Sequence, residues 1–297
     1  MVPLAHLMGN DCMDVNLPIE KKISVLMPVF NGLPLIKASV QSILAQSYSN
    51  WECIIVDDGS TDGTSDYLDS LTDPRFIVCH FDKNKGRPTA REKTLELSTG
   101  EYVAFLDAGD MYAKDNLMLQ AGCLGNHPDV CLVASAICSF GTGTSLKRCR
   151  GVSRMQKRVF DGSHYPNFAA SMLWGEKARR VHFDERMLLG EDRDYLERYL
   201  SGESFLEVPD VLYYYSEFDS VGKKKILKTY WLNIRKYARI TDWKHMALYL
   251  LKYIYASVVY PFVPIDRILM RRGRPLTDGE QERFQRDCIP LLDSALQ

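Results

Sequence analysis

Short apolar runs alternate with segments of helical period through the first half of the chain. Four runs predict β-strands, at Ile23 to Val29, Trp51 to Asp57, Phe76 to His80 and Tyr102 to Asp107. The intervening segments predict helices at about Pro34 to Ser47, Asp62 to Leu71 and Pro88 to Ser98. Strands that alternate with helices form mainly parallel sheets covered by helices. We therefore expect an α/β protein with a Rossmann-like half and a mixed, mainly parallel sheet.

The second half of the chain has a weaker pattern. The stretch from Gly141 to Tyr165 is rich in Gly, Ser, Lys and Arg without a sustained period, which predicts a loop or insertion. Helices are expected from Gly190 to about Leu200, from Ile226 to Arg239 and from Trp243 to Tyr260. We divide the chain into an N-terminal extension over 1–21, a main domain over 22–220 and a helical C-terminal extension over 221–297.

Composition limits size, charge and cysteine chemistry. With 297 residues and 46 % hydrophobic content, one large domain with appendages fits better than several independent domains. A formal net charge of −1 gives no general attraction for nucleic acid, so an anionic ligand needs local cationic groups. The eight cysteines form no Cys-x-x-Cys pair, which favours reduced and mostly buried thiols. Residues 1–22 lack the pattern of a secretory signal, so we expect a cytoplasmic protein.

The residues after each predicted strand are the first candidates for chemistry, because ligands of open parallel sheets bind beyond the carboxyl ends of strands. Residues 30–32, Phe-Asn-Gly, lack the Gly-x-Gly-x-x-Gly turn of dinucleotide dehydrogenases, which disfavours an NAD enzyme. The second strand ends in Asp57 and Asp58, whose carboxylates could accept the N–H of a uracil-like base. The alternative is a simple turn in which Asp62 caps the next helix.

Acidic residues also follow the fourth strand, where Asp107 and Asp110 flank Ala108 and Gly109. Carboxylate oxygens at this edge of the sheet suit a Mg²⁺ or Mn²⁺ ion that bridges the two phosphates of a nucleoside diphosphate. Such an ion would neutralise charge on the leaving phosphate. The alternative is an ordinary acidic turn.

Several motifs occur in a fixed order between Ile23 and Tyr215. They are Ser24-Val-Leu-Met-Pro-Val-Phe-Asn31, Ile54-Ile-Val-Asp-Asp-Gly-Ser-Thr-Asp62, Asn84-Lys-Gly-Arg-Pro-Thr-Ala-Arg91, Phe105-Leu-Asp-Ala-Gly-Asp110, Phe183-Asp-Glu185 and Gly190-Glu-Asp-Arg193. On these motifs the chain resembles a family 2 glycosyltransferase of the GT-A fold. The resemblance implies an inverting sugar transferase that uses a nucleotide-sugar donor, with uridine as the favoured base and guanosine or thymidine as alternatives.

The resemblance also implies a donor site. The residues it assigns to donor binding are Pro28, Phe30, Asn31, Asp57, Asp58, Gly86, Arg91 and Asp107. It assigns a Mn²⁺ or Mg²⁺ ion to Asp107 and Asp110. A guanidinium beside a pyrophosphate is chemically apt at Arg91, for which the alternative is a helix-surface arginine. The chain departs from the family pattern at Gly109, the usual place of the second carboxylate of Asp-x-Asp, and at Ser216, where relatives often carry Arg.

Glu191 and Asp192 stand at the start of a predicted helix and are the candidate catalytic residues. Asp192 shares a helical stripe with Tyr195, Leu196 and Tyr199, which predicts a partly desolvated carboxylate of raised basicity. The alternative is an acid that interacts with the helix dipole. The resemblance favours a direct displacement: Asp192 removes the acceptor proton, the oxygen attacks the anomeric carbon, and the nucleoside diphosphate leaves.

The C-terminal extension contains an apolar, tyrosine-rich segment from Met246 to Ile265. Cations flank this segment on both sides, at Lys244, Arg267, Arg271, Arg272 and Arg274. Prolines 261 and 264 interrupt it, and cations at both ends disfavour a simple membrane span. An interfacial helix within 243–275 would anchor the protein on the inner face of an anionic membrane. The alternatives are a helical lid packed on the main domain and a dimer contact.

Membrane contact would suit a saccharide acceptor linked to a polyprenyl lipid, as in the bacterial capsule and O-antigen assembly that the resemblance implies. A sugar nucleotidyltransferase would need a glycine-rich basic loop after the first strand, and this chain lacks one. A non-catalytic nucleotide-sugar-binding or scaffold protein of the same fold stays open because of Gly109 and Ser216, although Glu191 and Asp192 argue against it.

Overall fold

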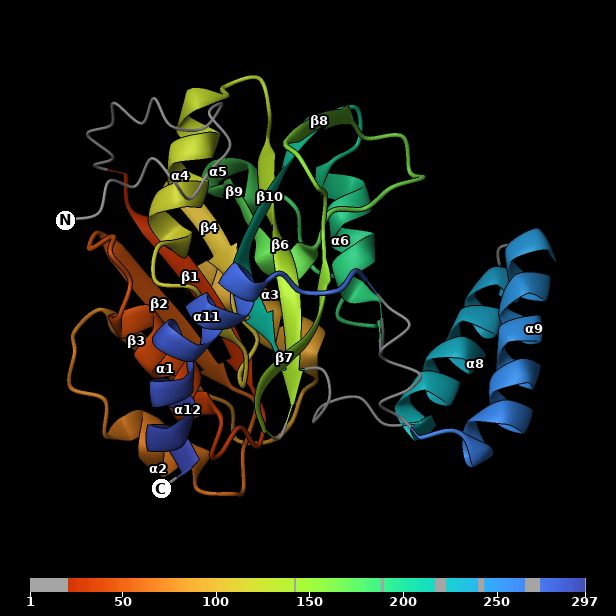
Figure 1. Cartoon of the computed structure of the whole chain (residues 1–297), viewed down its shortest axis with the longest axis horizontal. Helices are drawn as coiled ribbons and strands as arrows, with labels where there is room; N and C mark the ends of the chain where they lie inside the picture. The colour runs from red at the N-terminus through yellow and green to blue at the C-terminus, as the bar shows by residue number, and fades with distance from the viewer. Residues whose placement is uncertain are drawn as a thin grey trace.

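The computed structural model describes residues 21–141, 143–187, 190–216, 223–239, 243–264 and 273–296. Residues 1–20 of the expected N-terminal extension and Arg267, Arg271 and Arg272 lie outside the described residues. Figure 1 shows a single sheet with helices on both faces and a two-helix hairpin at one side of it. The expected α/β architecture is confirmed.

The first half of the chain has the predicted order of strands and helices. Its elements are β1 (Ile23–Val29), α1 (Ile36–Leu44), β2 (Trp51–Asp57), α2 (Thr64–Asp69), β3 (Phe76–His80), α3 (Arg87–Leu97) and β4 (Tyr102–Phe105). β1 and β2 are buried along their whole length, which is why their sequences are mainly apolar instead of alternating. The first three strands have the predicted bounds, whereas β4 ends at Phe105 and not at Asp107.

The loop predicted over 141–165 is wrong, because this stretch contains strands. The elements that follow β4 are β5 (Met111–Tyr112), α4 (Asn116–Asn126), β6 (Leu132–Gly141), β7 (Gly143–Arg150), β8 (Gln156–Val159), η2 (Phe168–Ala170), β9 (Ser171–Trp174), α5 (Gly175–Ala178), α6 (Glu191–Tyr199) and β10 (Ser204–Tyr215). The pairing of β6 with β7 shifts register twice. The buried residues Leu146 and Cys149 are therefore not at alternate positions, and the sequence shows no period of two.

Ten strands of the described chain form one sheet in the order β3-β2-β1-β4-β9-β6-β10-β5, with β7 beside β6 and β8 beside β10. β1, β2, β3 and β4 run parallel, and β9 is antiparallel to β4. On one face, α1 and α4 contribute side chains such as Ile36, Val40 and Leu117 to the core. On the other face, α3 and α6 contribute Leu95 and Tyr195. This arrangement brings the carboxyl ends of β1, β2 and β4 to one edge of the sheet.

The prediction of reduced thiols is wrong for two cysteines. Cys138 on β6 and Cys149 on β7 form a disulfide, because the register of these strands places them directly opposite each other. Of the other described cysteines, Cys53, Cys123, Cys131 and Cys288 are free and buried, and Cys79 is free and partly exposed.

The last part of the chain leaves the sheet and then returns to it. It contains α8 (Lys223–Arg239), α9 (Trp243–Val259), η3 (Tyr260–Phe262), α11 (Asp278–Asp287) and α12 (Ile289–Leu296). α8 and α9 form the hairpin seen beside the sheet in Figure 1. Phe284 and Leu292, from α11 and α12, join the core cluster of Phe140 and Tyr214. The segment 221–297 is therefore not one extension, since its last two helices belong to the sheet domain. None of the described helices has the length and apolar character required to cross a membrane.

Candidate active site

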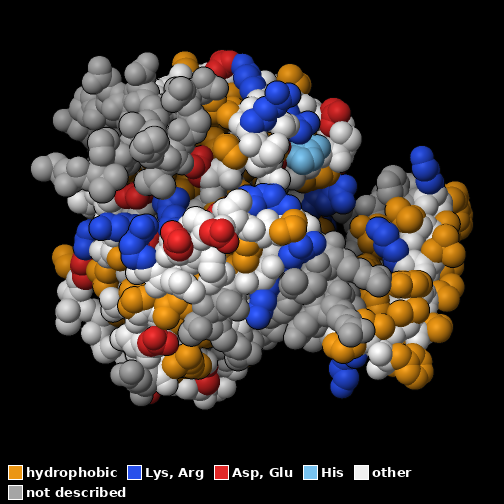
Figure 2. All heavy atoms as spheres, viewed as in Figure 1, with side chains coloured by type: hydrophobic (Ala, Val, Ile, Leu, Met, Phe, Trp, Pro, Cys, Tyr) orange, Lys and Arg blue, Asp and Glu red, His pale blue; other side chains and the backbone are white. Residues whose placement is uncertain are grey.

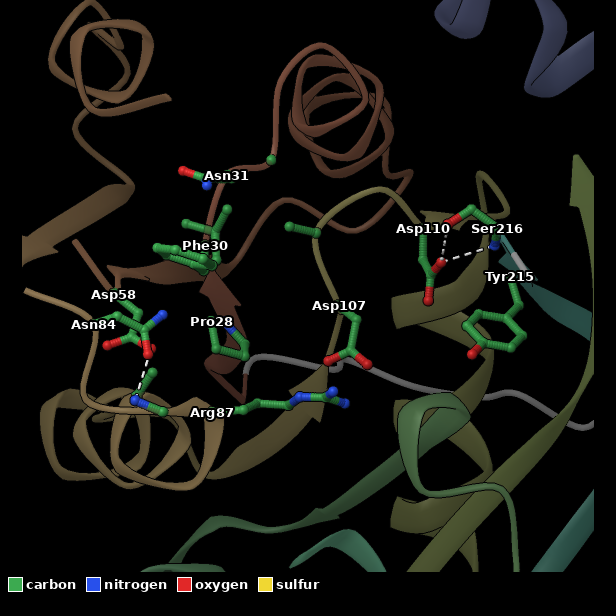
Figure 3. A pocket seen from close by; sticks show the side chains of 15 residues that line it. Pro28, Phe30, Asn31, Asp58, Asn84, Arg87, Asp107, Asp110, Tyr215 and Ser216 are labelled. Atoms are coloured by element: carbon green, nitrogen blue, oxygen red, sulfur yellow. Dashed lines mark hydrogen bonds between the residues drawn. The ribbon is translucent and has the colours of Figure 1, made fainter. Parts of the chain in front are cut away.

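A cavity of about 420 Å³ lies at the carboxyl ends of β1, β2 and β4. Its lining residues come from five separate segments of the chain and are Pro28, Val29, Phe30, Asn31, Gly32, Asp58, Asn84, Gly86, Arg87, Ala90, Asp107, Ala108, Asp110, Tyr215 and Ser216. Figure 3 shows Phe30, Asp58 and Asn84 gathered at one end of the cavity and Asp110 with Tyr215 at the other. The volume is in the range of small-ligand sites.

The end of the cavity nearest β1 is aromatic and rigidly built. Phe30 is 48 % exposed, which is unusual for a large apolar side chain next to a buried strand. Asn31 adopts φ 52°, and its side-chain oxygen accepts the Thr61 N–H at 2.8 Å while its own N–H donates to Ser60 Oγ at 2.8 Å. Asn31 thus ties the turn after β1 to the turn after β2, and leaves the Phe30 ring as a flat surface facing solvent.

Asp57 and Asp58 have different environments. Asp58 lines the cavity and accepts the backbone N–H groups of Lys85 at 2.6 Å and Gly86 at 2.9 Å. Asp57 is buried and does not line the cavity; it accepts the Ser60 N–H at 3.0 Å and lies 2.9 Å from His80 Nδ1. Asp57 therefore holds the turn, and only Asp58 is placed to touch a ligand.

His80 gives the Asp57 turn a pH dependence. Burial lowers the pKa of His80, but hydrogen bonds to Asp57 and Asp69 outweigh burial and raise it. Because the pKa of His80 is higher in the folded protein than the value of 6.5 for the unfolded chain, protonation of His80 stabilises the fold. This stabilisation is complete below pH 6.5 and is lost as the pH rises through the folded pKa. We expect urea unfolding to show a loss of about 0.5 kcal/mol over this interval, a small value because His80 is partly exposed. The His80→Gln variant should lack that loss, and equal pH dependence of both proteins would contradict the assignment.

A chain of four charged groups joins the cavity to the start of α6. Asp107 Oδ1 lies 2.9 Å from Arg91 Nη2, and Arg91 Nη1 lies 3.1 Å from Glu191 Oε1. Arg87 Nε lies 3.6 Å from the same Glu191 oxygen. Arg91 is only 3 % exposed, and although burial lowers its pKa, the charges of Asp107, Glu191 and Asp192 outweigh burial and raise it. Arg91 is therefore a permanently charged link between two carboxylates.

The expected contact of Arg91 with donor phosphates needs correction. Arg91 does not line the cavity, whereas Arg87, one helical turn earlier, does so with a side chain that is 47 % exposed. Figure 3 shows the Arg87 guanidinium directed toward Asp107 across the cavity. Of these two arginines, Arg87 is the one placed to meet a ligand.

The two departures from the family pattern lie next to each other. Gly109 has φ +97°, which glycine tolerates and other residues rarely adopt, and a Cβ there would lie 3.4 Å from Ser216 Oγ. Ser216 donates from its N–H and its hydroxyl to Asp110 Oδ1 at 2.8 and 3.0 Å. Burial and the charge of Asp107 raise the pKa of Asp110 to about 8. The turn thus offers carboxylates at positions 107 and 110 and none at 109.

The candidate catalytic pair divides between interior and surface. Glu191 is buried against Arg91, so its charge is already compensated. Asp192 is half-buried and is not among the cavity-lining residues; its Oδ1 accepts the N–H of Arg193 at 2.8 Å. The predicted stripe is only partly correct, because the carboxylate that faces the interior is Glu191. Asp192 lies beside the Arg91 link, toward solvent.

Four cavity-lining residues with polar side chains are absent from the predicted site: Asn84, Arg87, Tyr215 and Ser216. Asn84 and Arg87 belong to a motif that the sequence analysis identified, and the helical phase of α3 could have indicated that Arg87 lies on the face of Arg91. β10 ends at Tyr215, and Ser216 follows it directly. β10 reaches the cavity through its parallel pairing with β6. No local signal in the sequence indicates that pairing.

Comparison with known proteins gives one family and one fold. The model of the family described as glycosyl transferase family 2 matches residues 24–199. The Bacillus subtilis protein TuaG, named for teichuronic acid biosynthesis, is 46 % identical over 100 residues, which are 33 % of this chain and 40 % of TuaG. The Escherichia coli UDP-Glc:α-D-GlcNAc-diphosphoundecaprenol β-1,3-glucosyltransferase WfgD is 35 % identical over 98 residues, which are 33 % of this chain and 39 % of WfgD. The chain spans less than half the length of these relatives.

Two solved structures share the fold. Staphylococcus aureus TarS 1–349 in complex with UDP-GlcNAc has a TM-score of 0.54 and 16 % identity, over 93 % of this chain and 81 % of that one. The mannosyltransferase PcManGT from Pyrobaculum calidifontis, in complex with GDP-Man and Mn²⁺, has a TM-score of 0.57 and 18 % identity, over 86 % of this chain and 76 % of that one. At these identities the likeness concerns the fold alone.

Proposed function

The chain belongs to glycosyl transferase family 2, and from this premise we propose that it transfers a sugar from a nucleoside-diphosphate donor to a hydroxyl group of an acceptor. The observation that carries the proposal is the cavity itself. It has an exposed aromatic ring at Phe30, a cation at Arg87 and a carboxylate at Asp107, which suit a base, a diphosphate and a metal ion in turn. The Arg91 link then leads to a helix start that carries Asp192.

We favour a UDP-sugar as donor and a saccharide or lipid-linked saccharide as acceptor. The name of WfgD contains UDP-Glc and a diphosphoundecaprenol acceptor, and TarS was solved with UDP and with UDP-GlcNAc. TuaG and the Escherichia coli protein WcaA are named for teichuronic acid and colanic acid biosynthesis. These names support a place in bacterial surface polysaccharide synthesis.

A Mn²⁺ or Mg²⁺ ion fits the donor set at the inner end of the cavity. Asp107 and Asp110 both line the cavity and offer only oxygen ligands, the kind that these ions prefer. When bound, the ion would neutralise charge on the leaving diphosphate. Asp107 and Asp110 are the residues that would hold it.

The protein's own residues then have separate tasks. Phe30 packs on the face of the base, and the Asp58 carboxylate holds Gly86 so that α3 begins at the cavity. Arg87 provides positive charge for the diphosphate. Glu191 fixes the start of α6 through its ion pair with Arg91. Asp192 is not the partner of Arg91 in that ion pair, and its carboxylate accepts the proton of the attacking hydroxyl. A single displacement of this kind inverts the anomeric centre.

Calorimetric titration with UDP, with and without Mn²⁺, tests the donor site. We expect binding that strengthens with Mn²⁺ and is lost on chelation. In Asp107→Asn the effect of Mn²⁺ should fall at least about tenfold, since even outer-shell partners of metal ligands contribute that much. The matched control is Asp66→Asn, an exposed acid on α2 that should bind as the native protein does.

Two results would contradict the donor site: no heat with UDP, GDP or TDP in the presence of Mn²⁺, or equal binding by Asp107→Asn. The same panel with nucleotide sugars and a product assay separates an enzyme from a non-catalytic binding protein of the same fold. Binding without any product, across donors and acceptors, would favour the latter.

A further inference from the structure

The α8–α9 hairpin uses only one face of each helix to hold itself together. The rings of Tyr230 and Tyr249 lie 6.2 Å apart, and those of Trp231 and Tyr253 lie 6.0 Å apart. Ala256, which shares the α9 face of these tyrosines, is fully buried. This face of α9 is therefore covered by α8.

The opposite face of α9 is an apolar stripe open to solvent. Its members follow the spacing i, i+7, i+8, i+11 and i+15, and they are Trp243, Leu250, Leu251, Ile254 and Val258. Their exposed fractions run from 41 to 66 %. Figure 2 shows hydrophobic side chains gathered along the outer edge of the hairpin. A soluble helix normally turns such a stripe inward, so this one is available to an outside partner.

The charged residues within the two helices are all cations. Neither α8 nor α9 contains an aspartate or a glutamate. Lys224, Lys228 and Arg235 lie on one stripe of α8 together with the exposed Trp231. The Trp231 ring, on the cationic stripe of α8, packs on Tyr253 of α9. Leu250 and Ile254 are the next positions around the circumference of α9 from Tyr253. The cationic stripe of α8 therefore adjoins the apolar stripe of α9 on the same side of the hairpin.

We propose that this hairpin docks on the surface of an anionic lipid bilayer, with the α9 stripe among the acyl chains and the α8 cations against the headgroups. An apolar stripe beside an aromatic and cationic one matches the interface of such a bilayer. A second copy fits less well, because pairing two copies of helices that contain no acidic residue would bring cations together. Membrane docking is independent of the donor cavity, so it can be tested without donor or acceptor.

The test is flotation of the full chain with vesicles of phosphatidylcholine alone or mixed equally with phosphatidylglycerol. We expect flotation with the anionic vesicles, weakened by salt. Leu251→Glu combined with Ile254→Glu should lower the bound fraction at least about tenfold, since each buries an apolar group on docking. Each of Lys228→Gln and Arg235→Gln should lower partition to anionic vesicles about fivefold. The control is Val159→Glu, which changes an exposed apolar residue on β8 and should float as the native chain does.

Three results would overturn the proposal. The first is native protein that stays out of the anionic vesicles. The second is an equal loss of flotation by the Val159 control. The third is a dimer without vesicles that the Leu251 and Ile254 changes dissociate, which would make a second copy the occupant of the stripe. Circular dichroism of each variant against the native chain tests whether the helix content is unchanged, which separates a loss of binding from a loss of helix.

Discussion

Replacing Asp192 by Asn should lower kcat by about 10²- to 10⁴-fold, the usual contribution of a positioned general base. The amide keeps the size of the carboxylate and the oxygen that accepts the Arg193 N–H, so the start of α6 should keep its shape. KM for the donor should change little, because Asp192 does not line the donor cavity. Steady-state kinetics with a saccharide acceptor, together with UDP titration of the same variant, measures both quantities.

A matched control for this change exists on the same helix. Asp194 is also in the first turn of α6, but its carboxylate pairs with Arg198 at 2.6 Å. The Asp194→Asn variant should lose little activity, because an exposed i, i+4 pair contributes at most about 0.5 kcal/mol. Near-native kcat in folded Asp192→Asn, or an equal loss in Asp194→Asn, would remove Asp192 from the role of base.

Removing the Arg91 guanidinium should destabilise the protein by about 3–5 kcal/mol, since it would leave two carboxylates without their shared buried partner. The Arg91→Met side chain keeps an apolar stem but loses the bonds to Asp107 and Glu191 and the contact of the guanidinium with the Phe168 ring. Urea unfolding followed by circular dichroism gives the difference. Activity should fall as well, because the position of α6 depends on this link.

The control is Arg87→Met, one turn earlier on α3. Arg87 is largely exposed and lies 3.6 Å from Glu191, so its removal should cost about 1 kcal/mol or less. It should instead weaken binding of UDP. Adding Glu191→Gln to Arg91→Met should recover part of the lost stability, because it removes one of the two uncompensated charges. If Arg91→Met and Arg87→Met were equally stable, the ion pairs of Arg91 would not make the proposed contribution to the free energy of unfolding.

The sequence predicts the parallel part of the fold well and the antiparallel part poorly. β1 and β2 are buried on both faces, so their apolar runs identify them without any long-range information. Among the described strands β7 pairs with β6 alone, with two shifts of register, and it carries Lys147 and Arg148. Its few apolar positions therefore do not alternate. For the same reason the Cys138–Cys149 pair cannot be read from the spacing of the cysteines.

The site could be predicted as a set of turns but not as a set of contacts. Motifs after β1, β2 and β4 meet at one cavity because parallel strands end on the same side. Which arginine faces the cavity depends on the rotation of α3 about its axis, and both Arg87 and Arg91 suit a phosphate by chemistry alone. The role of Ser216 at Asp110 depends on the entry of β10 into the sheet, which pairs residues far apart along the chain.

The return of the chain to the sheet after the hairpin has a consequence for biosynthesis. Phe284, Cys288 and Leu292 share a core cluster with Ala38, and α12 packs on α1. Among the described helices α1 is translated first, and its outer side is covered only after α11 and α12 have been made. Contacts of such long sequence separation slow folding and expose apolar surface in the meantime. The hairpin is therefore translated while the outer surface of α1 is still uncovered.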